Sequence, residues 1–112
     1  MKKFMLSCVC ALLMCGTAVY SQTENKKTET FKVYGNCKMC KATIEGSLKS
    51  KDGIFSKEWS TKTKMISVTY DTAKITLDQI KQAIADAGYD SDDVRAKDEK
   101  YKKLHKCCQY ER

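Results

Sequence analysis

The chain has 112 residues, enough for one small domain, and its formal net charge is +7. The lysines are scattered, without an arginine-rich stripe or interleaved aromatic residues, so a solvated surface explains the charge better than nucleic-acid binding does. The sequence contains neither a nucleophile beside a paired base nor a phosphate-binding loop, and it therefore does not resemble an enzyme.

Residues 1–21 have the layout of a bacterial secretory signal peptide. Lys2 and Lys3 give a basic start, residues 4–19 are almost entirely apolar, and Ser21 is a small residue at the expected cleavage point. The apolar run is shorter than the roughly 20 residues that a membrane span needs, so we expect no stable membrane insertion after cleavage. No small residue precedes a cysteine at the end of this run, which disfavours a lipoprotein anchor. The mature protein is therefore expected to be periplasmic or otherwise exported.

Hydrophobic periodicity and turn signals predict regular elements from residue 30 onwards, after a polar, flexible leader over residues 22–29. In chain order they are strand 30–34, helix 40–50, strand 54–59, strand 64–70, helix 76–88, strand 92–96 and helix 98–108. The order β-α-β-β-α-β predicts an α+β, ferredoxin-like sandwich, with an antiparallel sheet that carries both helices on one face. The domain would cover residues 30–96, and residues 97–112 would form a tail with a helical extension.

Alternating apolar residues give each predicted strand a face for the core. The predicted core-facing strand residues are Phe31, Val33, Phe55, Trp59, Ile66, Val68 and Tyr70. The second helix opens with a capping box, in which Thr76 and Gln79 satisfy each other's backbone donors, and ends at Gly88. Its core face is expected to be Leu77, Ile80, Ile84 and Ala87. In the tail helix, Tyr101, Leu104 and Cys108 share one side.

The seven cysteines are unevenly placed, and three of them (Cys8, Cys10 and Cys15) would leave with the signal peptide. The other four form two close pairs, Cys37 with Cys40 and Cys107 with Cys108. An even number of cysteines in an oxidising compartment usually indicates disulfides. Two close pairs at opposite ends of a domain are more typical of a binding site than of a structural framework.

The first pair lies on a loop between a strand and a helix, with Cys40 at or just inside the first helical turn. The unpaired N–H groups and the dipole at a helix N-terminus favour a thiolate, and Lys38 and Lys41 add nearby positive charge. Two thiolates suit Cu(I), which we favour, or Hg(II) by the same argument of softness, whereas Zn(II) usually takes four ligands. Met39, between the cysteines, is expected to be exposed.

Five motifs occur in order along residues 30–90: Gly35-x-Cys37-x-x-Cys40, Ile44-Glu45, Gly53-Ile54, Val68-x-Tyr70-Asp71 and Gly88-Tyr89. Together they resemble the heavy-metal-associated domain. This is the fold of small copper chaperones, of the metal-binding modules of copper and zinc transporting ATPases, and of the periplasmic mercury-binding protein. The chain departs from the family's usual Gly-Met-x-Cys loop, because its Gly35-Asn36-Cys37 is one residue shorter and lacks the packing methionine.

The resemblance implies that Cys37 and Cys40 bind a soft metal ion and pass it to a partner with a similar loop. Such a partner would be a metal-transporting ATPase or another metal-transfer protein. The resemblance also implies that Tyr89 lies beside the loop as a residue behind the ligands. A monomer and a dimer that shares one metal ion between two loops both remain open.

The tail carries three further candidate ligands, His105, Cys107 and Cys108. They could form a supplementary metal site, supply further ligands to Cys37 and Cys40, or lie on a surface helix without binding anything. Two other functions for the chain also remain open. It could be a thiol–disulfide oxidoreductase that uses Cys37 and Cys40, although it has no proline to serve as the cis-proline of thioredoxin-like folds. It could also be a scavenger or sensor that binds metal without passing it on.

Overall fold

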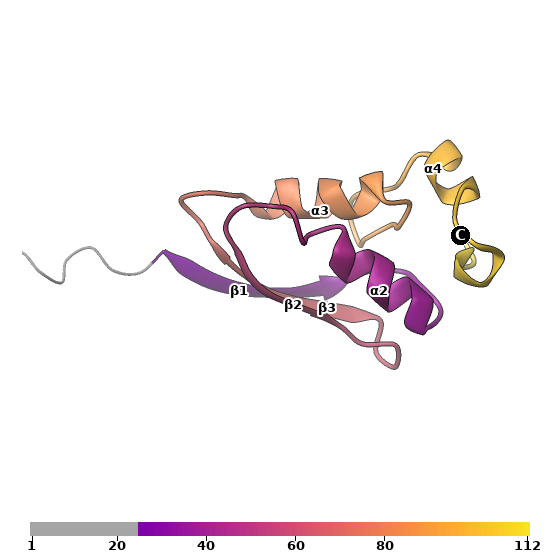
Figure 1. Cartoon of the computed structure of the whole chain (residues 1–112), viewed down its shortest axis with the longest axis horizontal. Helices are drawn as coiled ribbons and strands as arrows, with labels where there is room; N and C mark the ends of the chain where they lie inside the picture. The colour runs from indigo at the N-terminus through magenta and orange to yellow at the C-terminus, as the bar shows by residue number, and fades with distance from the viewer. Residues whose placement is uncertain (1–24) are drawn as a thin grey trace, which may run out of the picture.

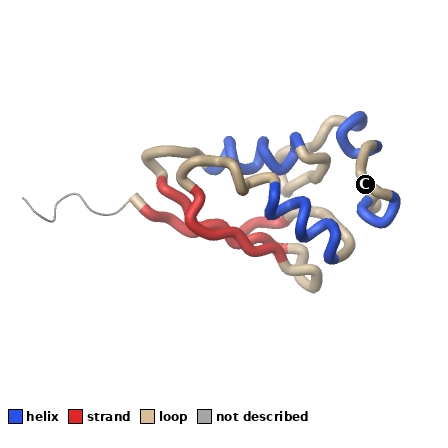
Figure 2. The backbone as a smooth tube through the Cα atoms, viewed as in Figure 1, coloured by secondary structure: helices blue, strands red, loops and turns tan. Residues whose placement is uncertain are grey.

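The computed structural model describes residues 25–112 of the chain. Its described elements are β1 (Lys26–Lys32), α2 (Lys38–Gly46), β2 (Ile54–Trp59), β3 (Met65–Asp71), α3 (Leu77–Asp86), α4 (Asp98–Lys102) and the 3₁₀ helix η1 (Lys106–Cys108). In this part of the chain the strands form an antiparallel sheet in the order β1-β3-β2. Both α2 and α3 lie on the same face of that sheet, as Figures 1 and 2 show. The predicted α+β, ferredoxin-like arrangement of the helices and sheet is confirmed.

The central strand β3 shows why the sequence folds this way. Its residues alternate between the core and the outer face, and Ile66, Val68 and Tyr70 are all buried. Because side chains alternate along a strand, these apolar residues of β3 face the helices, while Ser67 and Thr69 between them face the other side of the sheet. Ile44 of α2 closes over this face, together with Ile80 and Ile84 of α3, which were predicted to face the core.

β2 departs from the predicted alternation. A bulge between Ile54 and Ser56 shifts the register with β3, and the side chain of Phe55 is 56% exposed instead of lying beside Trp59 in the core. Because one extra residue in a strand reverses which side chains point inwards, the prediction for Phe55 was wrong although the bounds of the strand were right. Trp59 is fully buried, as predicted.

The predicted leader and first strand also need correction. Residues 26–29 were assigned to the flexible leader, but they belong to β1 and pair with residues 68–71 of β3. The alternating Thr28, Thr30 and charged residues carry little hydrophobic signal, so periodicity did not reveal this half of the strand. The first helix, expected over 40–50, instead runs as α2 from Lys38 to Gly46.

The ends of α3 follow the predicted capping chemistry. The Thr76 hydroxyl accepts a hydrogen bond from the Gln79 amide, and the Gln79 side chain accepts one from the Thr76 backbone N–H. At the other end Gly88 has φ +104°, and the N–H groups of Gly88 and Tyr89 bond back to Ala85 and Ile84. This Schellman motif ends the helix and directs the chain towards the loop that carries Cys37 and Cys40.

The predicted strand over residues 92–96 is absent. The chain makes one isolated bridge, between Ser91 and Val33, and then turns, with the Ser91 N–H donating to the Val94 carbonyl. The Asp90 carboxylate accepts a hydrogen bond from the Ala96 N–H, which closes the turn. These local side-chain and backbone bonds compete with an extended conformation, and a single Val94 offers little apolar burial to oppose them.

The tail is helical in two short pieces instead of the one predicted helix over 98–108. α4 ends at Lys102, and the chain extends at His105 before η1 begins. The side chain of Gln109 donates to the carbonyls of Lys102 and Leu104 and so satisfies the end of α4. We refer to residues 97–112 as the C-terminal strap. It packs at the end of the molecule where β1 finishes and α2 begins (Figure 1).

The expected signal peptide, residues 1–21, and its three cysteines lie outside the described residues. Within residues 25–112 no helix combines the length and the apolar character needed to cross a membrane.

Candidate metal centre

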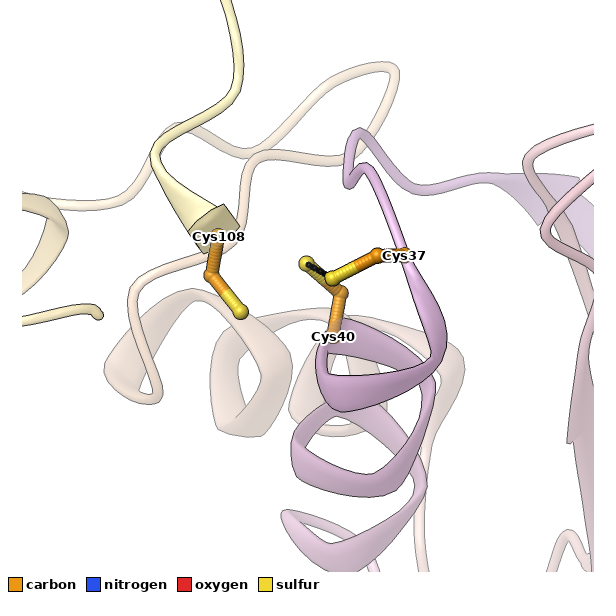
Figure 3. Close-up of side chains that lie close together, drawn as sticks. All are labelled: Cys37, Cys40 and Cys108. Carbon is orange, nitrogen blue, oxygen red and sulfur yellow. Dashed lines mark hydrogen bonds between the residues drawn. The ribbon is translucent and has the colours of Figure 1, made fainter. Parts of the chain in front are cut away.

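The paired cysteines are held at the start of α2. Cys37 is the N-cap residue of the helix and is half-buried, while Cys40 lies in the first turn and is fully buried. Their Sγ atoms are 3.9 Å apart and both point to one side of the loop, as Figure 3 shows. The spacing of two intervening residues therefore brings both sulfurs to one point, as the sequence predicted.

The backbone at the start of α2 favours negative charge on the sulfur of Cys37. The N–H groups of Cys40 and Met39 lower the pKa of the Cys37 thiol to about 7, because they stabilise its thiolate. The Asn36 N–H donates to Cys40 Sγ at 3.3 Å. The predicted contribution of Lys41 is not seen, because its ammonium group pairs with Glu45 at 2.6 Å and Glu58 at 2.9 Å.

The ion pairs of Lys41 help to hold α2 in position instead. Glu45 Oε2 also accepts a hydrogen bond from the Trp59 N–H at 2.8 Å, and Lys41 Nζ donates to the Trp59 carbonyl. This network ties the first turns of α2 to the end of β2. The Ile44-Glu45 motif of the sequence thus contributes one core residue and one residue that anchors α2, the helix that carries Cys40.

The ring of Trp59 forms the floor of the loop. Its indole N–H donates to the Val33 carbonyl at 3.0 Å. A Cβ atom on Gly35 would lie 3.1 Å from two carbons of this ring and 3.3 Å from Cys40 Cβ. A side chain at residue 35 would therefore push the loop off the indole, which explains why glycine suits this position.

Cys108 joins the pair from the C-terminal strap. The Sγ atoms of Cys37, Cys40 and Cys108 all lie within 4.8 Å of one another, and Cys108 is only 1% exposed. In Figure 3 the side chain of Cys108 points towards the loop from the opposite segment. Burial, followed by the neighbouring Cys40, raises the pKa of the Cys108 thiol to about 12. The metal-free protein therefore combines one acidic thiol with one that stays protonated at neutral pH.

The structure separates Cys108 from the other two tail candidates. Cys107 is exposed, and its Sγ lies 3.7 Å from Met39 Sδ and 3.9 Å from Cys108 Sγ, outside the three-sulfur cluster. Its carbonyl accepts a hydrogen bond from the Asn36 side chain at 3.2 Å, which joins the strap to the loop. His105 is exposed and does not belong to the cluster.

Tyr89 lies behind the sulfurs, in the region that the family resemblance implied. It is fully buried, and its hydroxyl has no hydrogen-bond partner among the described residues. Burial, followed by the nearby Cys108 and Cys40, raises the pKa of this phenol. A buried hydroxyl without a partner is costly, and this one lies beside two of the clustered cysteines.

Three residues that fasten the strap were not identified from the sequence. The Tyr110 hydroxyl donates to the Gly88 carbonyl and accepts from the Asp90 N–H, both at 2.9 Å. The Arg112 guanidinium makes two hydrogen bonds to the Asp90 carboxylate, at 2.9 and 3.0 Å, and both side chains are 10% exposed. No local sequence pattern indicates these contacts, because they join residues about 20 positions apart.

Comparison with known proteins agrees with this geometry. The model of the heavy-metal-associated domain matches residues 30–90, which is more than half of the chain. The chain belongs to the heavy-metal-associated domain family. A copper chaperone, CopZ, from Staphylococcus aureus (strain bovine RF122 / ET3-1) is 40% identical over 55 residues, which cover 49% of this chain and 81% of CopZ.

Solved structures of the family have the same fold. Oxidized MerP from Ralstonia metallidurans CH34 is 31% identical with a TM-score of 0.56, over 59% of this chain and 93% of MerP. The water-soluble region of the P-type ATPase CopA from Bacillus subtilis is 28% identical with a TM-score of 0.59, over 62% of this chain and 47% of that region. The family match ends at residue 90, so the strap lies beyond the matched domain.

Proposed function

We propose that this protein binds Cu(I) through Cys37 and Cys40 and passes it to a partner that carries a similar pair of cysteines. The observation that carries the proposal is the convergence of two sulfurs, 3.9 Å apart, at a helix N-terminus that favours thiolate. Thiolate ligands select soft ions such as Cu(I). The similarity to a copper chaperone supports copper, and the similarity to MerP keeps Hg(II) as the second candidate.

Transfer by ligand exchange needs no catalytic base. A thiolate of the partner forms a new Cu–S bond, one of the original Cu–S bonds breaks, and the released sulfur takes up a proton when its pKa lies above the ambient pH. Copper stays Cu(I) throughout, so no electron donor or acceptor is involved. Cys37 is half-buried and Cys40 is fully buried, so the incoming thiolate would reach the copper ion from the side of Cys37.

The partner is proposed to be the metal-binding module of a metal-transporting ATPase, because the water-soluble region of the P-type ATPase CopA from Bacillus subtilis shares the fold. The signal-like residues 1–21 support export, which would place this exchange outside the cytoplasm. The lysines near the loop, Lys38 and Lys64, would favour a partner with an acidic rim.

The proposal is tested by anaerobic Cu(I) titration against a competing chelator. The full chain is used in a background of Cys8→Ser, Cys10→Ser and Cys15→Ser, so that thiols outside the described residues do not contribute. The double substitution Cys37→Ser/Cys40→Ser should weaken Cu(I) binding by several orders of magnitude, because it removes both loop thiolates. Tight Cu(I) binding that survives both substitutions would contradict the proposal.

A further inference from the structure

We propose that Cys108 is a third ligand, so that the resting protein holds the soft ion in a three-sulfur site that the C-terminal strap completes. This inference rests on the proposed function, because it assigns an additional ligand to the same ion. In this role, Cys108 of the strap competes with the thiolates of the transfer partner for the same ion.

The distances between the sulfurs fit a trigonal site. With metal–thiolate bonds of about 2.3 Å, a planar three-coordinate ion separates its sulfurs by about 4.0 Å, whereas a linear two-coordinate ion separates them by about 4.6 Å. Cys37 and Cys40 are 3.9 Å apart, and all three sulfurs lie within 4.8 Å of one another. The trigonal arrangement therefore needs only a small adjustment of Cys108, while the linear one requires the loop pair to spread.

The strap presents Cys108 from a fixed position. The Tyr110 hydroxyl bridges Gly88 and Asp90, and Arg112 forms a buried two-bond pair with Asp90. The ring of Tyr110 also stacks on that of Tyr89 at 5.8 Å between centroids. Because these contacts hold the strap on both sides of Tyr89, the third thiol is already in place before the ion arrives, and little ordering entropy is lost on binding.

The unpartnered hydroxyl of Tyr89 is an independent sign of a ligand at this point. It is fully buried beside Cys108 and Cys40 and lacks a hydrogen-bond acceptor among residues 25–112. Three thiolates around Cu(I) carry a net charge of −2, which is costly in a buried site without donors. The Tyr89 O–H and the Asn36 N–H that reaches Cys40 are the donors that this charge requires.

The exchange steps balance without a redox partner. When Cu(I) bound to the loop pair takes up Cys108, one Cu–S bond forms and the Cys108 thiol releases its proton. When the transfer partner arrives, its thiolate forms a Cu–S bond, the bond to Cys108 breaks, and Cys108 is protonated again. Copper stays Cu(I) in every step. The strap thus raises the affinity for Cu(I) while the protein is alone. Its bond to the ion must break before the ion can leave.

The adjacent Cys107 provides a matched control. Cys108→Ser and Cys107→Ser remove neighbouring thiols, but only the first belongs to the cluster. In the same background that lacks Cys8, Cys10 and Cys15, Cu(I)-loaded protein is examined by X-ray absorption. We expect three sulfur ligands in the parent and in Cys107→Ser, and two ligands with shorter Cu–S distances in Cys108→Ser. Cys108→Ser should also bind Cu(I) at least tenfold more weakly and release it to an acceptor severalfold faster.

A second variant covers the case in which Cys108→Ser disturbs folding. Arg112→Gln leaves every thiol intact but loosens the strap, and it should shift coordination and release in the same direction as Cys108→Ser. Two sulfur ligands in the parent, or three in Cys108→Ser, would overturn the inference. In that event the loss of binding in Cys37→Ser/Cys40→Ser would still support the proposed function, whereas its failure would appear as undiminished binding in that double variant.

Discussion

At the residue scale, the two cysteines of the loop differ more than their motif indicates. Cys37 is half-buried and faces backbone N–H groups, while Cys40 is enclosed by the core. The accessible sulfur is therefore also the one whose thiolate is stabilised, which is the combination that ligand exchange requires. The sequence predicted this pair from its spacing and its place before a helix, because both signals are local.

The pH dependence of alkylation tests this description of Cys37. Its pKa is lowered to about 7 from 9.0, so the thiolate forms as the pH rises through 7. In the metal-free protein, the rate of iodoacetamide modification at Cys37 should reach half of its maximum near pH 7. In denaturant the midpoint should rise to about 8.5. The rate is followed by mass spectrometry of the Cys37 peptide, and equal midpoints in the two states would contradict the prediction.

Tyr89→Phe tests the role of the buried hydroxyl. Because this hydroxyl has no partner in the metal-free protein, its removal should leave the free energy of unfolding unchanged or raise it by about 1 kcal/mol. If the hydroxyl donates to a metal-bound thiolate, the same variant should bind Cu(I) several times more weakly. Denaturant unfolding and chelator competition measure the two effects. Unchanged Cu(I) affinity would contradict a donor role for the hydroxyl, and a destabilised metal-free protein would show that the hydroxyl has a hydrogen-bond partner there.

The tail shows the limit of sequence reasoning at this scale. His105, Cys107 and Cys108 are equivalent candidates by residue type, yet only Cys108 reaches the loop pair. The choice depends on where the chain extends at His105 and on the anchors Tyr110 and Arg112. Those contacts are long-range, so periodicity and spacing carry no information about them.

At the element scale, the predicted order of helices and strands is right wherever the hydrophobic pattern is strong. It was wrong where a single irregularity intervenes, such as the bulge that exposes Phe55 or the turn that replaces the strand over 92–96. The predicted capping box and Gly88 are confirmed at the two ends of α3. Local hydrogen-bonding chemistry can be read from sequence, whereas a shift in register cannot.

Gly88 joins the end of α3 to the strap, and Gly53 provides a matched control. Both residues have positive φ, +104° and +94°, so an alanine at either position should cost about 1–2 kcal/mol of backbone strain. A Cβ on Gly88 would also lie 2.9 Å from the Lys100 carbonyl and 3.0 Å from Leu104 Cδ2, both in the strap. A Cβ on Gly53 would instead meet Lys74.

Gly88→Ala and Gly53→Ala should therefore lower the melting temperature to a similar degree but differ at the metal centre. Only Gly88→Ala should make the buried thiol of Cys108 open to alkylation in the folded, metal-free protein. Thermal unfolding and mass spectrometry of the Cys108 peptide provide the comparison. If Cys108 is equally protected from alkylation in both variants, the strap tolerates a displaced end of α3 and the prediction is wrong.

At the scale of the whole molecule, the strap is a segment beyond the matched heavy-metal-associated domain and is anchored to it. Asp90 is its central attachment, because its carboxylate bonds to Arg112 and to the Ala96 N–H. Burial opposes ionisation of Asp90, but the Arg112 and Ala96 hydrogen bonds prevail and hold its pKa below the usual range. The stabilisation is therefore complete above pH of about 4, the pKa of an unfolded Asp, and is lost as the pH falls through the lower folded value.

Asp90→Asn should destabilise the protein by about 3 kcal/mol at pH 7, because it leaves the buried Arg112 with only the exposed Asp98 as a counter-charge. Asp93→Asn, which alters an exposed partner of Lys81, should have a much smaller effect. Denaturant unfolding at pH 7 measures both. The difference between Asp90→Asn and the parent should shrink as the pH approaches 3, and a constant difference would contradict the assigned ion pair.

The central claim is that the loop cysteines bind a soft ion that can then be transferred to a partner protein. The most direct measurement loads the full chain with one equivalent of Cu(I), in the background without Cys8, Cys10 and Cys15. The loaded protein is mixed anaerobically with a second heavy-metal-associated domain, and the copper content of each is determined after separation. We predict that copper moves to the acceptor, and that the Cys37→Ser/Cys40→Ser variant carries none to transfer. Copper that stays on this chain at equilibrium, while the same acceptor takes Cu(I) from a chelator of equal affinity, would contradict the account.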